Sequence, residues 1–357
     1  MKILLLGGTG AMGTPLSKLL VPDHEVYVTS RAVRTSEMLT LHYLQGDALE
    51  DRFLDQTIEQ YGPFDAIVDF MAYSTQAFQK RLFQLLTETK QYVYLSSSRV
   101  YANSQQPLTE NSPRLLDVSS DREFLKSDEY SLEKARQENL LKTSGMNHWT
   151  IIRPYITYNT ERLQLGVFEK ESWLFRAIRG RTLLFPKDMA EKFTTLTFGG
   201  DVAWGIARLI GNPRALGETV HITAAKAVKW GEILEIYRDT LEKVLHIRPA
   251  VCLTDSSEWI KNVKKDYDAV RYDRLYDRRF NNQKLHSLCG PYEFVTPELG
   301  LAQCLEQFLR ESRPFQKLHW KYEAYVDRIT NEETPIDEIP TVEGRQRYLE
   351  NRWKQKI

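Results

Sequence analysis

The sequence predicts an α/β protein: a doubly wound parallel sheet with a smaller, mostly C-terminal α/β domain. Short, continuous apolar runs bounded by glycine are typical of strands buried on both faces, and residues 2–6 (KILLL) form the first of them. Helical spacing alternates with such runs up to about residue 155, which indicates a parallel sheet with helices on both faces. The length of 357 residues leaves room for the second domain.

The expected elements follow one another in a regular order. We expect strands at 2–6, 25–29, 65–71, 91–97 and 148–153, and helices at 11–20, 76–88 and 130–142. Pro15 is tolerable near the first turn of a helix, where its missing amide is not needed. After about residue 155, a strand-like 219–223 and a helix-like 230–243 indicate that the sheet receives one more strand.

The same rhythm suggests the domain boundaries. We expect a first domain at 1–155 with a return around 194–223, a second at 156–193 and 224–312, and an extension at 313–357. The extension is either a packed helical appendage or a partly ordered segment. Packing is favoured, because Trp320, Tyr322, Tyr325 and Trp353 are costly to leave in water.

Charge and cysteine content limit the classes of function. Lys+Arg and Asp+Glu both number 48, so zero net charge argues against a nucleic-acid-wrapping surface and a polybasic membrane binder. The sequence contains no run of about 18 apolar residues that could cross a membrane. Three cysteines without a CxxC pair favour a reducing, cytoplasmic location, and the scattered histidines give no reason to expect a metal.

A glycine-rich turn follows the first expected strand. Gly7, Gly10 and Gly13 let the backbone turn sharply and approach a pyrophosphate, and the N-terminus of the next helix offers free amides. This context predicts a Rossmann-type dinucleotide site, with a ligand-free glycine turn as the alternative. The residues expected at the cofactor in this turn are Gly7, Thr9, Gly10, Ala11, Met12 and Gly13.

The end of the second strand bears on the choice of dinucleotide. NAD-selective proteins place a carboxylate about 20 residues after the glycines, whereas this chain has Ser30 there, with Arg31 and Arg34 close by. We therefore expect NADP, with NAD as the alternative if the arginines are solvated. Asp47 is expected either at the adenine or in a turn, and Ala72 at the cofactor.

Tyr130 and Lys134 form a Y-x-x-x-K pair at the start of an expected helix. Such a pair is expected about once by chance, so its context carries the weight. The pair lies on one helix face, and the lysine ammonium favours the phenolate form of the tyrosine, a proton-transfer group. A serine hydroxyl among Ser96, Ser97 and Ser98, at the end of a central strand, can hold the reacting oxygen.

These features together resemble the extended short-chain dehydrogenase/reductases, the NAD-dependent epimerase/dehydratase family that modifies nucleotide sugars. The residues that carry the resemblance are Gly7 to Gly13, Ser96 to Tyr101, Tyr130 to Lys134, Arg153-Pro154 and Asp201 to Ala203. It spans about residues 1–310 and implies a nucleotide-binding first domain, a substrate-binding second domain, and Tyr130, Lys134 and Ser97 as catalytic residues. It also implies a homodimer formed through helices 76–88 and 130–142.

Several departures from the family pattern alter the expected substrate pocket. Ser98-Arg99 replaces the acidic pair of the 4,6-dehydratases, so 4,6-dehydration is not expected. Asp69 to Tyr73 replaces the family's histidine-and-alanine stretch, and Ile156 replaces an asparagine. These traits are similar to an atypical branch near the chloroplast stem-loop RNA-binding proteins and to bacterial surface-polysaccharide enzymes.

The substrate residues are predicted more coarsely. A nucleotide-diphosphate sugar needs cations for its phosphates. Candidates are Tyr73, Ser98, Arg99, Arg271 and Lys284, with Arg162, Arg274 and Arg278 as further arginines; Asp201 is expected to cap a helix at 202–210. We expect an NAD(P)-dependent epimerase or reductase acting at a ring carbon of the sugar, in glycan-precursor synthesis. The alternative is a dinucleotide- or RNA-binding protein without activity.

Overall fold

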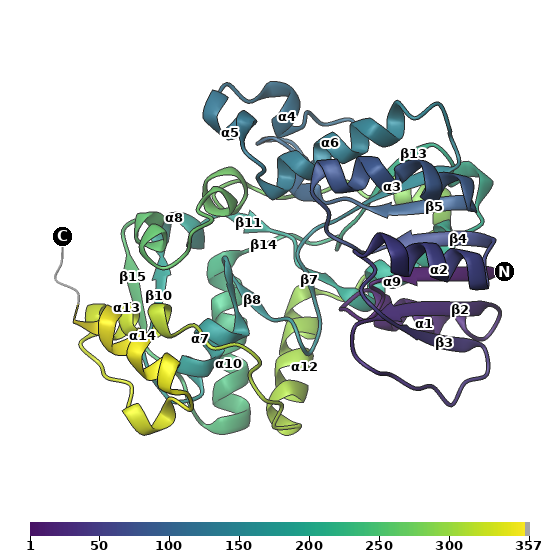
Figure 1. Ribbon diagram of the computed structural model, residues 1–357. Coiled ribbons are helices and arrows are strands. Elements are labelled where there is room, and N and C mark those ends of the chain that lie inside the picture. The colour runs from purple at the N-terminus through teal and green to yellow at the C-terminus, as the bar shows by residue number, and fades with distance from the viewer. Residues whose placement is uncertain (354–357) are drawn as a thin grey trace. The chain divides into compact units, whose positions relative to one another are not determined.

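The computed structural model describes residues 1–353, and its main feature is a seven-stranded parallel sheet (Figure 1). The strands, in spatial order, are β13 (Glu218–Ile222), β6 (Trp149–Pro154), β5 (Thr89–Leu95), β4 (Phe64–Asp69), β1 (Lys2–Leu6), β2 (Glu25–Ser30) and β3 (Leu41–Gln45). The order reverses between β1 and β4, which is the place where open sheets of this kind bind ligands beyond the carboxyl ends of the strands. The predicted Rossmann-type sheet is confirmed.

Alternating side chains of the strands build two apolar layers. Ile3 and Leu5 face one layer and Leu4 and Leu6 the other, and all four are fully buried. The first layer is covered by α1 (Gly13–Leu20), α9 (Gly199–Leu209) and α11 (Gln283–Cys289), and the second by α2 (Asp51–Tyr61), α3 (Thr75–Thr87) and α6 (Tyr130–Lys142). This double cover explains why the strands read as continuous apolar runs.

The predicted elements differ from the observed ones at their ends, and the sequence predicted neither bounds for β3 nor a helix at the position of α2. Helix α1 begins at Gly13 rather than residue 11, because residues 11 and 12 still belong to the turn. The sequence did not predict the short helices η1 (Ser98–Val100), α4 (Leu115–Val118) and α5 (Arg122–Lys126). Arg114 donates to Ala135 O, Glu138 and Asn139, and Arg136 donates to Leu125 O and Ser127 O, so this segment covers the outer side of α6.

The chain forms two compact units. The first comprises Met1–Thr157, Thr195–Lys226 and Arg279–Val295, and the second Tyr158–Thr194, Ala227–Arg278 and the chain from Thr296. The segment 279–295, which the sequence analysis placed in the second domain, packs with the sheet unit through Leu285 and Phe294. The short elements β7 (Thr157–Tyr158), β12 (Thr197–Phe198) and η2 (Pro213–Ala215) complete the connections near the sheet.

The second unit consists of helices and short strands. Its elements are β8 (Gln164–Leu165), β9 (Phe168–Glu169), α7 (Lys170–Ala177), β10 (Leu183–Pro186), α8 (Lys187–Ala190), β11 (Phe193–Thr194), β14 (Val228–Lys229), α10 (Trp230–Leu245), β15 (Val251–Thr254), η3 (Ser257–Asn262), η4 (Val270–Arg274), α12 (Pro297–Arg310), α13 (Trp320–Thr330), η5 (Ile336–Glu338) and α14 (Val342–Arg352). The strands pair only two by two, as β10 with β15, β11 with β14 and β8 with β9.

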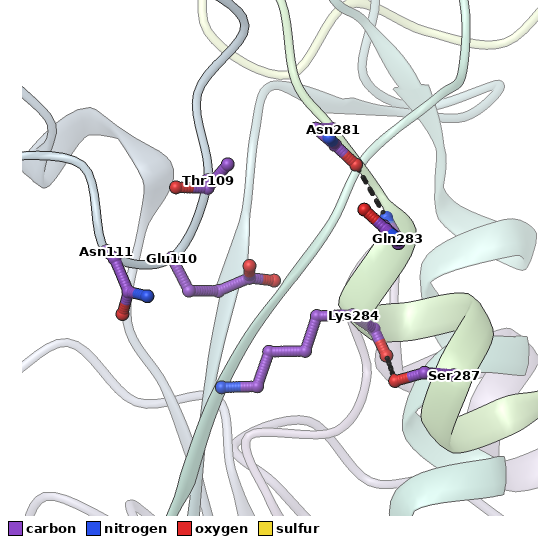
Figure 2. A pocket seen from close by; sticks show the side chains of 7 residues that line it. All are labelled: Thr109, Glu110, Asn111, Asn281, Gln283, Lys284 and Ser287. Carbon is purple, nitrogen blue, oxygen red and sulfur yellow. Dashed lines mark hydrogen bonds between the residues drawn. The ribbon is translucent and has the colours of Figure 1, made fainter.

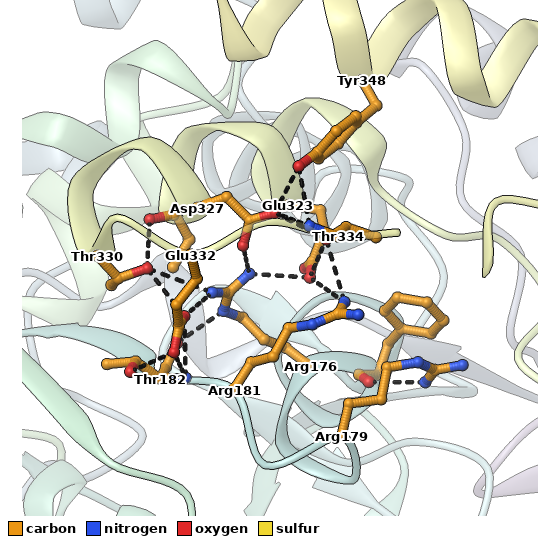
Figure 3. Close-up of polar contacts among 12 residues, drawn as sticks. Arg176, Arg179, Arg181, Thr182, Glu323, Asp327, Thr330, Glu332, Thr334 and Tyr348 are labelled. Atoms are coloured by element: carbon orange, nitrogen blue, oxygen red, sulfur yellow. Dashed lines mark hydrogen bonds and ion pairs between the residues drawn. The ribbon is translucent and has the colours of Figure 1, made fainter. Parts of the chain in front are cut away.

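A buried arginine fixes the C-terminal helices within the second unit (Figure 3). Arg176 is fully buried and contacts Glu323 at 2.8 Å, Asp327 at 2.6 Å and Glu332. Trp320 is buried, as expected, whereas Trp353 is 72% exposed because it lies past the end of α14. The extension is therefore packed as far as it is described; residues 354–357 lie outside the described residues.

Within residues 1–353, no helix is long and apolar enough to cross a membrane. No cluster of metal-ligating side chains occurs in the same part of the chain, and its three cysteines are free.

Candidate active site

The glycine turn between β1 and α1 is shaped by close backbone contacts. Gly7 has a φ of 68°, and its amide donates to Thr29 Oγ1 at 2.8 Å. A Cβ at Gly7 would lie 2.5 Å from Met71 Sδ, and one at Gly13 would lie 2.5 Å from the carbonyl of Gly8. Around Gly10 a Cβ would meet nothing within 4 Å. No side chain caps the N-terminus of α1, which leaves its first amides to a ligand or water.

The residues after β2 lie at the expected place for the adenosine end of a dinucleotide. Ser30 is buried and its hydroxyl donates to Ala32 O at 2.8 Å. Arg31 and Arg34 are exposed, and neither forms an ion pair with any residue in 1–353. Asp47 accepts from the amide of Leu49 at 2.9 Å, which is the turn role that had been left open for it. Ala72 is exposed in the loop after β4.

The Y-x-x-x-K pair lies at the start of α6, as predicted. Tyr130 is 39% exposed, while Lys134 is only 4% exposed and donates to Leu95 O at 2.7 Å and to Met71 O at 3.5 Å. These carbonyls end β5 and follow β4, so Lys134 is held at the carboxyl edge of the sheet. Burial is the main cause that lowers the pKa of Lys134 to about 8.

Ser97 lies two residues after β5, near the same edge. It is 7% exposed, and its hydroxyl oxygen accepts from the amide of Arg99 at 3.2 Å. The Arg99 guanidinium carbon lies 5.2 Å from the centre of the Tyr130 ring, and the guanidinium pairs with Glu129, the N-cap residue of α6. Arg99 thus links the predicted serine to the predicted tyrosine.

The sequence analysis missed a buried ionic cluster behind the site. Glu138 is fully buried and accepts from Arg153 at 2.7 and 2.6 Å, from Ser96 at 2.6 Å and from Arg114 at 3.1 Å. Burial acts to raise the pKa of Glu138, but Arg153, Ser96 and Lys142 together outweigh it, so the pKa is lowered. The cluster fixes α6 to the segment that carries Ser97. The only available signal was Glu138 four residues after Lys134 on the helix face, because the partner Arg153 is distant in sequence.

Two predicted substrate residues are placed where a substrate cannot reach their polar groups. Tyr73 is buried and its hydroxyl donates to Asp69 at 2.9 Å. Ser98 is fully buried and its hydroxyl donates to Arg153 O at 2.8 Å. Both side chains point into the packed interior of the first unit, so these two predictions are corrected. Of the residues predicted around them, Arg99 retains partial exposure, with 16% of its side chain accessible.

The cations predicted in the second half are differently placed. Arg274 and Arg278 are buried and both pair with Asp273, so they stabilise the second unit. Arg271 is exposed and lies 4.8 Å from the ring centre of Tyr272, and Arg162 pairs with Glu169 at 3.3 Å.

Lys284 borders an open, polar pocket in the first unit (Figure 2). The pocket has a volume of about 350 Å³ and is lined by Thr109, Glu110, Asn111, Asn281, Gln283, Lys284 and Ser287. The Lys284 ammonium pairs with Glu218 at 2.5 Å.

Asp201 does not cap a helix at 202–210, as the sequence predicted. It lies inside α9, which begins at Gly199, rather than capping a helix at 202. Its carboxylate accepts from Tyr292 Oη and from the amide of Val295, each at 2.9 Å. Asp201 therefore holds the segment 279–295 against the sheet unit.

Among known protein families, residues 3–161 match the model of the NAD dependent epimerase/dehydratase family. Residues 3–161 are therefore similar to members of that family. The match covers the glycine turn, β5 with Ser97, and the helix with Tyr130 and Lys134, which are the segments that carry the resemblance seen in the sequence. A search of curated proteins finds no match.

Solved structures share the fold. UDP-glucuronic acid 4-epimerase from Bacillus cereus, in complex with UDP-glucuronic acid and NAD, has 15% identity and a TM-score of 0.64 over 88% of this chain and 100% of that chain. MoeE5 in complex with UDP-glucuronic acid and NAD has 17% identity and a TM-score of 0.63, with the same coverage. The epimerase Mth375 from Methanothermobacter thermautotrophicus has 16% identity and a TM-score of 0.64 over 87% of this chain and 92% of that chain.

Proposed function

We propose that the protein is a nicotinamide-dependent epimerase or reductase that acts at a ring carbon of a nucleotide-activated sugar. The observation that carries the proposal is the placement of Tyr130 at the exposed start of α6, with the buried ammonium of Lys134 fixed to Leu95 O near Ser97. A phenol, a cation and a hydroxyl at one sheet edge are the groups that a hydride transfer from a sugar alcohol requires. The family match and the UDP-sugar complexes of similar folds support the same chemistry.

The glycine turn fits a dinucleotide. At Gly7, Gly8 and Gly13 a side chain would clash with neighbouring protein atoms, a Cβ at Gly10 would meet nothing within 4 Å, and α1 lacks a side-chain cap at the end that faces the turn. When bound, the nicotinamide supplies hydride transfer at its C4 atom. Lys134 would hold the nicotinamide ribose, Tyr130 would move the proton at the sugar hydroxyl, and Ser97 would bind the same oxygen.

The choice between NAD and NADP depends on Arg31 and Arg34. Both are exposed and unpaired within residues 1–353, so both are available to a 2′-phosphate, and β2 ends in Ser30 rather than a carboxylate. These observations favour NADP, whereas the similar folds were solved with NAD. We further propose that the protein acts in the cytoplasm, in the synthesis of glycan precursors.

The homodimer implied by the resemblance requires the outer faces of α3 and α6. Every residue from Ser131 to Leu141 is buried or half-buried, because the segment with α4 and α5 covers the outer side of α6. On α3, Phe83 remains 69% exposed. We therefore propose that any dimer uses a surface other than this helix pair.

Thermal melting against a panel of UDP-, GDP-, CDP- and dTDP-sugars, with NAD or NADP present, tests the proposed substrate class. A ligand that binds the folded protein alone raises the melting temperature. We expect the sugar of one of these nucleotides to raise the melting temperature when the dinucleotide is also present. Salt-dependent retention of RNA with no effect of any nucleotide sugar would instead support the non-enzymatic alternative.

A further inference from the structure

Asp69, the last residue of β4, is a fully buried carboxylate that the proposed reaction does not use. One oxygen accepts from the amide of Met71 at 2.9 Å. The other accepts from Tyr92 Oη at 2.7 Å and Tyr73 Oη at 2.9 Å. Within residues 1–353, it forms no ion pair with a lysine or an arginine. Burial raises the pKa of Asp69, whereas its three hydrogen-bond donors and the positive charge of Lys134 act in the opposite direction and favour the carboxylate.

Lys134 is the complementary case, a buried ammonium without a paired carboxylate. Its hydrogen bonds go to the carbonyls of Leu95 and Met71, and its Nζ lies 4.7 Å from the ring centre of Tyr94. Met71 connects the two charges, because its amide donates to Asp69 and its carbonyl accepts from Lys134. One residue of backbone therefore has the anion at one end and the cation at the other.

Other charged groups around Lys134 are less able to balance it. The titratable groups that face it are Tyr130, Glu133 and Glu138 of α6, Tyr94 of β5, and Asp69 of β4 with its partners Tyr73 and Tyr92. Glu138 is already paired with Arg153, and Glu133 is only half-buried and reaches water. Among the carboxylates that raise the pKa of Lys134 against its burial, Asp69 acts most strongly.

We propose that Asp69 is a positioning residue that serves as the buried counter-charge of Lys134 and fixes the Met71 peptide that holds it. The inference rests on the proposed function, since it concerns how Lys134 remains charged for that reaction. Two opposite charges in a low-dielectric interior attract strongly even without direct contact. Asp69 thus places a negative charge at the end of β4, on the same Met71 peptide that holds the lysine.

The test is the titration of Lys134 in the full-length protein, followed by NMR at its side chain and assigned with Lys134→Arg. In Asp69→Asn we expect the lysine pKa to fall by about one unit, a tenfold change in the charged fraction above the pKa. The matched control is Asp65→Asn, on the same strand, where the carboxylate pairs with the exposed Lys90. This control and Tyr92→Phe, which keeps the Asp69 carboxylate, should leave the lysine titration within a few tenths of a unit.

A reciprocal measurement covers the case in which Asp69→Asn does not fold. In Lys134→Met, the pKa of Asp69 should rise by a similar amount, because coupling between two sites is mutual. An unchanged Lys134 titration in folded Asp69→Asn, or an unchanged Asp69 titration in Lys134→Met, would overturn the proposal. Neither readout needs turnover, so both remain decisive if no nucleotide sugar proves to be a substrate.

Discussion

Two buried arginine clusters, one in each unit, show how a structural ionic network differs from one that supports a site. In the second unit, Arg176 binds Glu323, Asp327 and Glu332, so each of these charged groups has an ion-pair partner inside the cluster (Figure 3). In the first unit, Arg153 binds both oxygens of one carboxylate, that of Glu138. One helical turn from Glu138, however, Lys134 bonds only to carbonyls, and Tyr130 is exposed. A buried ionic network that lies next to a cation without a carboxylate partner and an exposed phenol can support proton transfer at that phenol.

Breaking each cluster gives the largest expected effects. Arg176→Met and Glu138→Gln each leave a buried charge without its partner, which costs about 3–5 kcal/mol of unfolding free energy. Chemical denaturation measures this loss in both. Only Glu138→Gln should also lower kcat, because it releases α6 from the segment of Ser97. Equal kcat in the two variants would remove the distinction between the clusters.

The pH dependence of the first cluster gives the next effect. The pKa of Lys134 is lowered to about 8, so the ammonium is charged below that pH and neutral above it. Activity that needs the charged lysine should fall about tenfold for each unit of pH above 8. The measurement is kcat/KM as a function of pH, with dinucleotide affinity followed in parallel. A profile flat to pH 10 would contradict the proposed role of Lys134.

The two free arginines sharpen the contrast between exposed and buried cations. Arg31→Ala combined with Arg34→Ala should weaken NADP binding about tenfold or more, since hydrogen bonds to charged groups contribute about 1.5–3 kcal/mol each. NAD binding should change little. Calorimetry of both dinucleotides measures this, with Lys18→Ala combined with Arg52→Ala as the charge-matched control. Equal losses for NAD and NADP would favour NAD as the cofactor.

The smallest effect is expected at the exposed side of α3. Phe83→Asp places a charge on a side chain that is 69% exposed, and surface changes of this kind alter stability by about 0.5 kcal/mol or less. Sedimentation of the variant should match that of the wild type. If the wild type were a dimer and Phe83→Asp a monomer, the α3 face would be an interface after all.

The sequence predicted the strands of the sheet and the helix that carries Tyr130 and Lys134. It did not predict the buried contacts that hold this helix in place. The strand β1 and the helix at Tyr130–Lys142 were predictable because apolar runs and helical spacing are local signals. The burial of Ser98 and Tyr73 was not, because it follows from contacts with Arg153 and Asp69 made only in the folded unit. The ion pair Glu138–Arg153 and the shared contact of Asp69 and Lys134 with Met71 are likewise set by the register of neighbouring strands and helices, which a single sequence does not display.

Single-turnover absorbance of reduced nicotinamide shows whether Tyr130 transfers the proton. The protein loaded with NAD or NADP is mixed with the nucleotide sugar that gave the largest rise in melting temperature. Wild-type protein should show a change in nicotinamide absorbance, and Tyr130→Phe should slow this change by about 100- to 10,000-fold while it retains dinucleotide affinity. An equal rate in Tyr130→Phe, or no absorbance change with any nucleotide sugar of the panel, would contradict this role of Tyr130.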